Sequence, residues 1–305
     1  MRQVCEGSDV ANVVVFLASD NCRLLTGAII PVDGGLSFGN ILDILNFGYV
    51  DLSQNPLTTV TRISSLPIQT LNLSNCEITT LEDASFGPLI PEKGLVPFEK
   101  VRYLSLAYND LHSLPQDVFT FMSGLTTLDL SGNPLAFIDQ VTMAAITDLE
   151  LYLSGCELET LPEGMFRRQR RLRRLDLSDN RFTTVPAVLS EAANLLAIKN
   201  LTKLQDLRLC RNSKLQNISA GALGGLPNLV SLHICYNPRL TVIDPDFLSF
   251  TDDHDVEIWP TLTELTAVDA TSNPYTCDCK NQWAVDVLVP MLTGLGTHEL
   301  AGNMM

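Results

Sequence analysis

The sequence predicts an α/β repeat solenoid in which short strands form one curved parallel sheet. The first observation is a motif with apolar residues at its fourth and sixth positions, and usually at its first, and with Asn or Cys at its ninth. This motif occurs nine times. The second observation is spacing, since five of the eight gaps between successive ninth positions are 21 to 25 residues long. Such repetition is typical of chains whose units stack and bury a shared core.

The clearest copies lie between Val101 and Leu135, where Leu104, Leu106 and Asn109 recur 24 residues later. This spacing indicates a short strand with inward Leu side chains, followed by a turn in which Asn satisfies backbone groups. The ninth position, called the anchor below, is occupied by Asn55, Cys76, Asn109, Asn133, Cys156, Asn180, Asn212, Asn237 and Asn273.

The motif, LxxLxLxxNxL, resembles the leucine-rich repeat. After the anchor most units continue with an apolar residue, and Pro and Phe often follow, as at Pro115 and Phe119 or Pro162 and Phe166. This continuation resembles the subtype common in extracellular leucine-rich repeat proteins. The resemblance implies a horseshoe-shaped solenoid over residues 41–275, with a parallel sheet on its concave side.

Residues 1–40 do not follow the repeat. They predict a helix beginning at Ser8 and a strand over Ala28 to Val32. The segments FLASD and TGAIIPVDGG resemble, in order and spacing, the C-terminal end of short-chain dehydrogenases/reductases. We interpret residues 1–40 as a remnant of that family, joined by gene fusion or by a misjoined gene model. The alternative for the first 20 residues is a signal peptide, which Asp9 and Asn12 disfavour.

The same resemblance places the family's chemistry upstream of this segment, in a Gly-rich dinucleotide turn and a Tyr and Lys four residues apart. No Tyr in the chain is followed by such a Lys. None of the four His residues is paired with a Ser or Cys nucleophile in a motif. We therefore expect no enzymatic activity and no cofactor. Residual dehydrogenase function is the least favoured alternative.

Residues 276–305 are predicted to form a truncated C-terminal cap and tail. Cys277 and Cys279 resemble the start of the cysteine-flanked cap of extracellular leucine-rich repeat proteins, but no cysteine follows them. They lack the further ligands that a zinc site needs. The acidic segment 252–257 lacks the Gly of a calcium loop and is predicted to be a solvated loop, so no metal site is expected.

The cap resemblance and three glycosylation sequons, at Asn72, Asn200 and Asn217, favour a secreted or cell-surface origin. The alternative is an intracellular scaffold. A formal charge of −15 argues against nucleic-acid binding, and no apolar segment is long enough to span a membrane. The expected partner is therefore a protein ligand.

A basic segment stands out in this acidic chain, with six arginines between Arg167 and Arg174. Three interpretations remain open. The segment is the solvated outer face of one repeat, a site for a sulfated glycan or an acidic protein, or a furin-type processing site at Arg168 to Arg171.

The cysteines within the repeats fall into two groups. Cys76 and Cys156 occupy anchors and are predicted to be free, buried and inert. Cys210 and Cys235 lie two residues before successive anchors, which places them on adjacent parallel strands about 4.8 Å apart, within disulfide range. The alternative is a pair of exposed thiols whose side-chain directions do not allow a bond.

The predicted binding site is the concave face, because residues between inward leucines point outward in a strand. Tyr and Arg contribute most strongly to protein recognition, and the carboxylates favour a partner with a basic patch. The predicted site residues are Asp51, Tyr103, Asp129, Tyr152, Arg174, Asp176, Arg208, His233, Tyr236 and Asp269.

Overall fold

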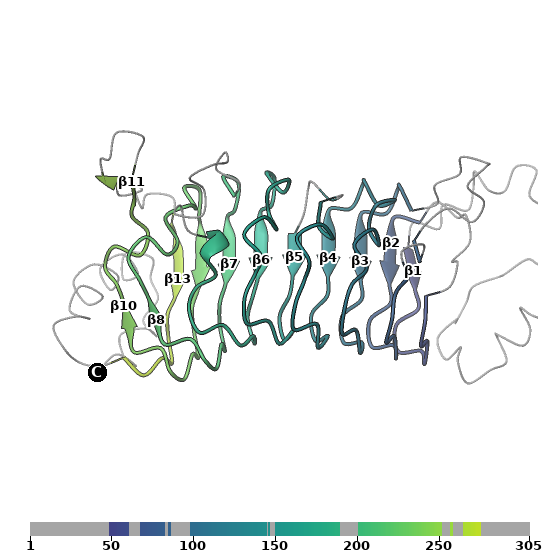
Figure 1. Cartoon of the computed structure of the whole chain (residues 1–305), viewed down its shortest axis with the longest axis horizontal. Helices are drawn as coiled ribbons and strands as arrows, with labels where there is room; N and C mark the ends of the chain where they lie inside the picture. The colour runs from purple at the N-terminus through teal and green to yellow at the C-terminus, as the bar shows by residue number, and fades with distance from the viewer. Residues whose placement is uncertain are drawn as a thin grey trace, which may run out of the picture.

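The computed structural model describes residues 49–60, 68–82, 85–86, 98–144, 146, 150–189, 201–251, 257–258 and 265–275. Within these ranges nine strands form one parallel sheet, which runs along the length of a solenoid (Figure 1). The strands follow one another in chain order. They are β1 (Tyr49–Asp51), β2 (Thr70–Asn72), β3 (Tyr103–Ser105), β4 (Thr127–Asp129), β5 (Glu150–Tyr152), β6 (Arg174–Asp176), β7 (Asp206–Arg208), β9 (Ser231–His233) and β13 (Ala267–Asp269). The predicted leucine-rich repeat solenoid is confirmed.

Each strand contributes its central residue to the core, and these residues are in register from β1 to β13. Leu104, Leu128 and Leu151, for example, are fully buried and lie opposite one another. Phe119 and Phe166, from the Pro and Phe continuation, are also fully buried. The continuation therefore fills the core behind the sheet.

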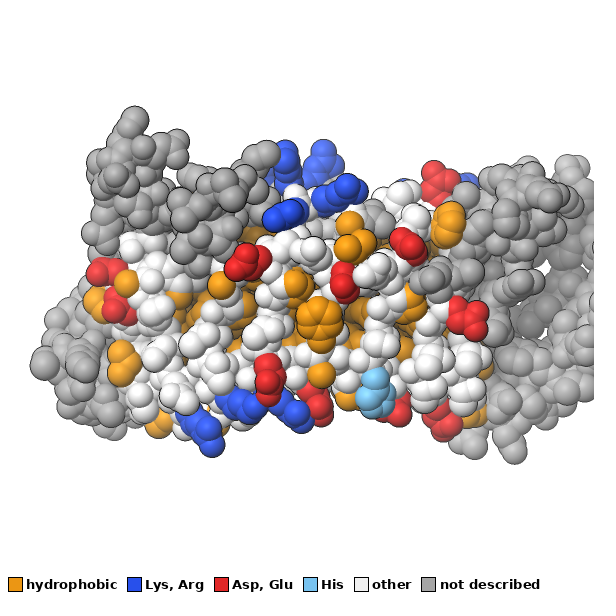
Figure 2. All heavy atoms as spheres, viewed as in Figure 1, with side chains coloured by type: hydrophobic (Ala, Val, Ile, Leu, Met, Phe, Trp, Pro, Cys, Tyr) orange, Lys and Arg blue, Asp and Glu red, His pale blue; other side chains and the backbone are white. Residues whose placement is uncertain are grey.

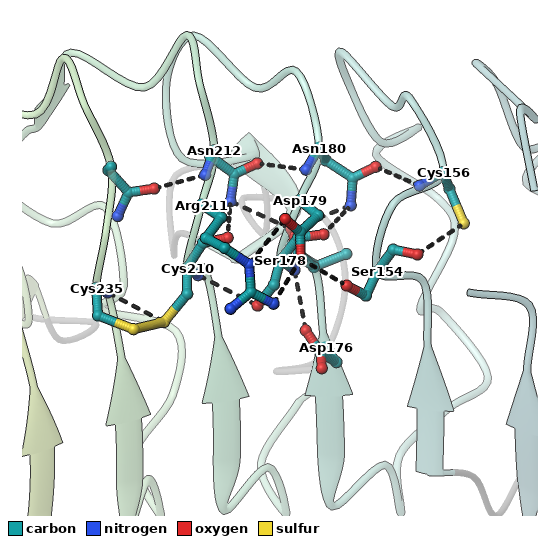
Figure 3. Close-up of polar contacts among 12 residues, drawn as sticks. Ser154, Cys156, Asp176, Ser178, Asp179, Asn180, Cys210, Arg211, Asn212 and Cys235 are labelled. Carbon is teal, nitrogen blue, oxygen red and sulfur yellow. Dashed lines mark hydrogen bonds and ion pairs between the residues drawn. A yellow bond between two sulfur atoms is a disulfide. The ribbon is translucent and has the colours of Figure 1, made fainter. Parts of the chain in front are cut away.

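The anchor asparagines join each repeat to the one before it. Asn133 donates its side-chain amide to the backbone oxygens of Leu106 and Leu130, at 2.9 and 2.8 Å, and its Oδ1 accepts from the Leu111 N–H. Asn237 and Asn273 bind backbone groups of the preceding repeat in a similar way. So do Asn180 and Asn212, which Figure 3 shows. Because the anchor asparagines other than Asn273 are buried, their amides satisfy backbone groups that water does not reach.

The anchors Cys76 and Cys156 are free and buried, as predicted. Each thiol donates to a backbone oxygen of the preceding repeat, Leu52 or Leu130. A thiol does not replace the Asn Oδ1, which accepts a backbone N–H of the preceding repeat. In the repeat before Cys76, the Leu57 N–H donates instead to the backbone oxygen of Asn55. In the repeat before Cys156, the Leu135 N–H donates in the same way to the backbone oxygen of Asn133. Burial raises the pKa of the Cys156 thiol to about 12.

The residue before every anchor has a positive φ, between 51° and 69°, which the sequence did not predict. Only two of these nine residues are glycines, namely Gly132 and Gly155. In each repeat but the last, the N–H of this residue donates to a backbone oxygen of the following repeat, and these bonds continue the sheet's hydrogen bonding into the turns. This shared turn conformation fixes the course of the chain after each strand.

Short elements occupy the long gaps and the side of the repeats opposite the sheet. A 3₁₀ helix, η2 (Ala187–Leu189), begins the insertion before β7. Strand β8 (Asn217–Ile218) pairs in parallel with β10 (Val242–Ile243). Strand β11 (Phe250–Thr251) pairs antiparallel with β12 (Glu257–Ile258), so Glu257 of the acidic segment lies in a strand, and the rest of that segment lies outside the described residues.

No helix within the described ranges is long and apolar enough to cross a membrane. The predicted N-terminal helix and strand, the cap cysteines Cys277 and Cys279, and the sequon at Asn200 lie outside the described residues.

Candidate binding surface

The concave face presents two rows of side chains, because each strand turns its first and third residues away from the core. The first row consists of Tyr49, Thr70, Tyr103, Thr127, Glu150, Arg174, Asp206, Ser231 and Ala267. The second row consists of Asp51, Asn72, Ser105, Asp129, Tyr152, Asp176, Arg208, His233 and Asp269. Nine of the ten predicted site residues lie in these rows, and of the two rows only Ser105 is buried.

Tyr236 does not lie in a strand. It precedes the anchor Asn237 with a φ of 56°, and its side chain is exposed at the turn that follows β9. It was predicted as a neighbouring outward position of the strand, but the strand ends at His233 and the chain then bends. Tyr108 occupies the equivalent turn position after β3 and is also exposed.

The aspartates of the second row bond locally to the backbone. Oδ1 of Asp51, Asp129, Asp176 and Asp269 accepts the N–H two residues later, at 2.9 to 3.1 Å. Asn72 does the same toward Ser74. Such bonds cap the ends of these five strands, so these side chains have a structural role. Each aspartate still carries a second carboxylate oxygen that a partner could engage.

A continuous polar network crosses β5, β6 and β7. The Arg174 guanidinium lies 3.0 Å from the Tyr152 hydroxyl and 3.0 Å from Asp206, and it also pairs with Glu150 at 3.6 Å. The Tyr152 hydroxyl donates to Glu150, and Arg208 pairs with Asp206 at 3.4 Å. The hydrogen bond with Tyr152 raises the pKa of Arg174. We call these five residues the concave network.

Three members of the concave network, Tyr152, Arg174 and Arg208, were predicted from sequence. Asp206 was not predicted, although its place directly before a buried Leu matches that of Glu150 and Arg174 and could have identified it. Its carboxylate joins two arginines on adjacent strands.

The predicted residues near the two ends of the sheet lie apart from this network. The Tyr49 hydroxyl donates to Asp51 at 3.2 Å, and the negative charge of Asp51 raises the pKa of Tyr49. Tyr103 is half-buried in β3, and this burial raises its pKa. In β9, the His233 ring nitrogen lies 2.9 Å from the Ser231 hydroxyl. The sheet therefore offers one connected polar centre and isolated groups on either side.

The turn that follows β6 carries a second polar cluster (Figure 3). Arg211 donates to both carboxylate oxygens of Asp179, at 2.6 to 2.9 Å, and Ser154 donates to the same carboxylate at 3.3 Å. Next to it, Cys210 and Cys235 are joined by a disulfide, with Cα atoms 4.5 Å apart. Both cysteines are buried, so the alternative of two exposed thiols does not describe them.

The basic segment lies in the connection between β5 and β6. Arg167, Arg168, Arg170, Arg171 and Arg173 are exposed, whereas Gln169 and Leu172 between them are buried. Lys and Arg side chains gather at the upper edge of the solenoid, over β5 and β6 (Figure 2). We call these five exposed arginines the arginine loop. Arg174 is not part of it, because it points onto the concave face.

The two sequon asparagines within the described residues have different surroundings. Asn217 is exposed in β8, opposite the main sheet. Asn72 is half-buried in β2, on the concave face, where a glycan would cover part of the predicted site.

Models of leucine-rich repeat families match residues 99–158 and 202–250, and 67–89 and 171–191. The chain is 31% identical to human vasorin over 159 residues, which are 52% of this chain and 20% of vasorin. It is 30% identical to human podocan-like protein 1 over 238 residues, covering 70% of this chain and 42% of that protein. The chain thus spans less than half the length of these relatives. The structure of human 5T4, a trophoblast glycoprotein, superimposes with a TM-score of 0.56 and 25% identity, covering 75% of this chain and 78% of that one.

The fold and these matches show that the chain is a leucine-rich repeat protein. More particularly, it is similar to members that are secreted or exposed on cell surfaces. A model described as enoyl-(acyl carrier protein) reductase matches residues 1–37, the segment that resembles short-chain dehydrogenases/reductases.

Proposed function

We propose that this chain is an extracellular protein-binding module that recognises its ligand through the concave face. The observation that carries the proposal is the concave network. Five charged or aromatic residues from three adjacent strands meet there, and Tyr and Arg are the residue types that dominate binding energy at protein interfaces. Their mutual contacts hold the side chains in place, which reduces the entropy that binding must remove.

The charge of the concave face indicates the kind of ligand. Its two rows contain six carboxylates and two arginines, so the surface is acidic even after the ion pairs of the network are counted. A ligand with a basic patch would complement it. Salt should then slow association more than it speeds dissociation.

Two observations favour an extracellular module over an intracellular scaffold. The similar proteins are secreted or lie at the cell surface. The Cys210–Cys235 disulfide is also of a kind that persists in oxidising compartments. We propose binding rather than catalysis, since the match to a reductase is confined to residues 1–37.

A photo-crosslinking experiment tests the location of the site. A crosslinking amino acid would replace Thr127, which faces outward in β4, or Thr120, which is exposed in the connection before β4. The protein would then be applied to cells that display extracellular proteins. We expect Thr127 to capture a discrete ligand that Thr120 does not capture. Capture from Thr120 alone would move the site away from the concave face.

For the captured ligand, Tyr152→Ala should weaken binding by about 2 kcal/mol, because an aromatic anchor and its contact with Arg174 are both lost. Tyr152→Phe keeps the ring and removes only the hydroxyl, so it should weaken binding less. Equal affinity for wild type and Tyr152→Ala would exclude the network as the centre of the interface.

We propose a second contact site, for an anionic partner, at the arginine loop. Within the described part of the chain, no carboxylate lies within ion-pair distance of Arg167, Arg168, Arg170 or Arg173. Four exposed guanidinium groups that the described residues leave without a counter-charge are an unusual concentration in a chain of charge −15. Binding of heparin or of polyglutamate tests this site, and failure of both would exclude it.

A further inference from the structure

We infer that the anionic partner of the arginine loop is a linear sulfated glycan, bound at the edge of the solenoid where β6 begins. This inference rests on the proposed anionic contact and specifies its class. It is independent of the concave face.

Buried side chains fix the backbone of the arginine loop. Phe166 and Gln169 are fully buried on either side of Arg167 and Arg168. The Gln169 side-chain amide donates to the backbone oxygens of Met143 and Ile146 in the preceding repeat, at 2.5 and 2.6 Å. Backbone bonds from Arg167 to Gly164 and from Gln169 to Phe166 form tight successive turns. The core therefore fixes the backbone from which the arginines project.

The arrangement of the arginines favours a chain of repeated anions over a single acidic group. Buried residues alternate with pairs of exposed arginines, so Arg167 and Arg168, Arg170 and Arg171, and then Arg173 follow one another along the surface. A guanidinium donates two parallel hydrogen bonds to the oxygens of a sulfate group, and a linear glycan presents such groups at regular intervals.

The surrounding charge disfavours an acidic protein as the partner. An acidic protein would bring a large negative surface close to a molecule whose own net charge is −15, and the two would repel each other. A glycan chain is narrow and approaches only the edge. Basic residues at the opposite edge differ from Arg167, Arg168 and Arg170 in their environment, because Arg181 pairs with Glu157 at 3.0 Å and Lys214 with Glu159 at 2.6 Å.

The experiment measures binding of a heparin octasaccharide, its desulfated form and polyglutamate to the full chain. Arg167→Gln/Arg168→Gln/Arg170→Gln should lower heparin affinity by about tenfold or more, since three charge-assisted contacts are lost. The charge-matched control Arg181→Gln/Lys214→Gln/Arg239→Gln should change it less than about twofold, because two of its cations are already paired and all three follow anchors at the opposite edge. Arg167→Lys/Arg168→Lys/Arg170→Lys should fall between the two, because lysine keeps the charge and loses the planar fork.

Each outcome is decisive. Heparin binding that exceeds binding of polyglutamate and of desulfated heparin, and that the loop variant alone abolishes, supports the inference. Polyglutamate binding as tight as heparin binding would reject the glycan class and leave the anionic contact standing. Equal losses of heparin affinity in the loop variant and the control variant would show that binding depends only on the net charge of the protein, and would reject the site. None of these results bears on crosslinking at Thr127.

Discussion

Two residues in each turn determine how the chain leaves the sheet. The anchor satisfies backbone groups of the preceding repeat. The residue before the anchor adopts a positive φ, which residues other than glycine rarely adopt. Tyr108, Arg211 and Tyr236 accept this conformation. A left-handed conformation costs such a residue about 1 kcal/mol or more. Because the same turn is repeated, the bonds between neighbouring repeats impose it despite that cost.

The two glycines of this series allow the backbone cost to be separated from crowding. A Cβ at Gly155 would meet only the backbone of Gly132, at 3.6 Å, whereas a Cβ at Gly132 would lie 2.5 Å from the Tyr108 ring. Gly155→Ala should therefore lower the free energy of unfolding by about 1 kcal/mol, from the backbone alone. Gly132→Ala should lower it further. Urea denaturation measures both.

The control for this comparison is Tyr108→Ala combined with Gly132→Ala. Removing the ring should bring the cost of Gly132→Ala down to that of Gly155→Ala. If Gly132→Ala still costs more than Gly155→Ala in the absence of the ring, crowding against Tyr108 does not explain the difference.

The Cys156 thiol links stability to pH. Its pKa is raised by burial to about 12 from the ordinary value of 9.0. Between these values the unfolded chain loses this proton before the folded chain does, so stability falls as pH rises from about 9 toward 12. Cys156→Ser removes the titration, and its stability should decline less over this range than that of wild type. Urea midpoints at pH 8 and pH 10.5 measure the difference, and parallel declines would contradict it.

Each strand of the main sheet is only three residues long and is stabilised by pairing with its neighbours, on both sides for every strand except β1 and β13. The sequence predicted the strands well, because the paired leucines of each motif are two residues apart, and a strand points residues at that spacing to the same side. It did not predict the turns, since seven of the nine residues that precede the anchors are not glycine, and most of these seven carry no local signal for a positive φ. It also did not predict the concave network as a unit, because contacts such as Arg174 with Asp206 join residues 32 positions apart.

The disulfide joins two neighbouring repeats, because Cys210 and Cys235 each lie two residues after the end of a strand, β7 or β9. It closes a chain segment with a sequence separation of 25 residues. Cross-linking a loop of that length restricts the unfolded chain and stabilises the fold by about 3 kcal/mol. Cys210→Ser/Cys235→Ser should lower the free energy of unfolding by about that amount. Denaturant unfolding measures the loss, and peptide mapping without reduction identifies the bond. Alkylation of both cysteines in unreduced protein would exclude it.

The whole molecule is a stack in which a repeat contacts mainly its immediate neighbours. One core of buried residues extends from Val60 to Ala270. In such a stack, the free energy of unfolding is approximately the sum of the stabilities of the single repeats and of the interfaces between neighbours. A substitution in a central repeat and the removal of a segment at one end therefore have different effects.

Deleting residues 1–35 should therefore leave the repeats folded, because the core of buried residues from Val60 to Ala270 runs through the repeats themselves. We expect the far-ultraviolet circular dichroism of the sheet and its urea midpoint to change little. By contrast, Leu151→Ala removes a fully buried side chain from the middle of the sheet and should cost about 2 to 5 kcal/mol. If the deletion instead unfolded all repeats together, or lowered the urea midpoint as much as Leu151→Ala does, residues 1–40 would be an integral part of the fold and not a separate remnant.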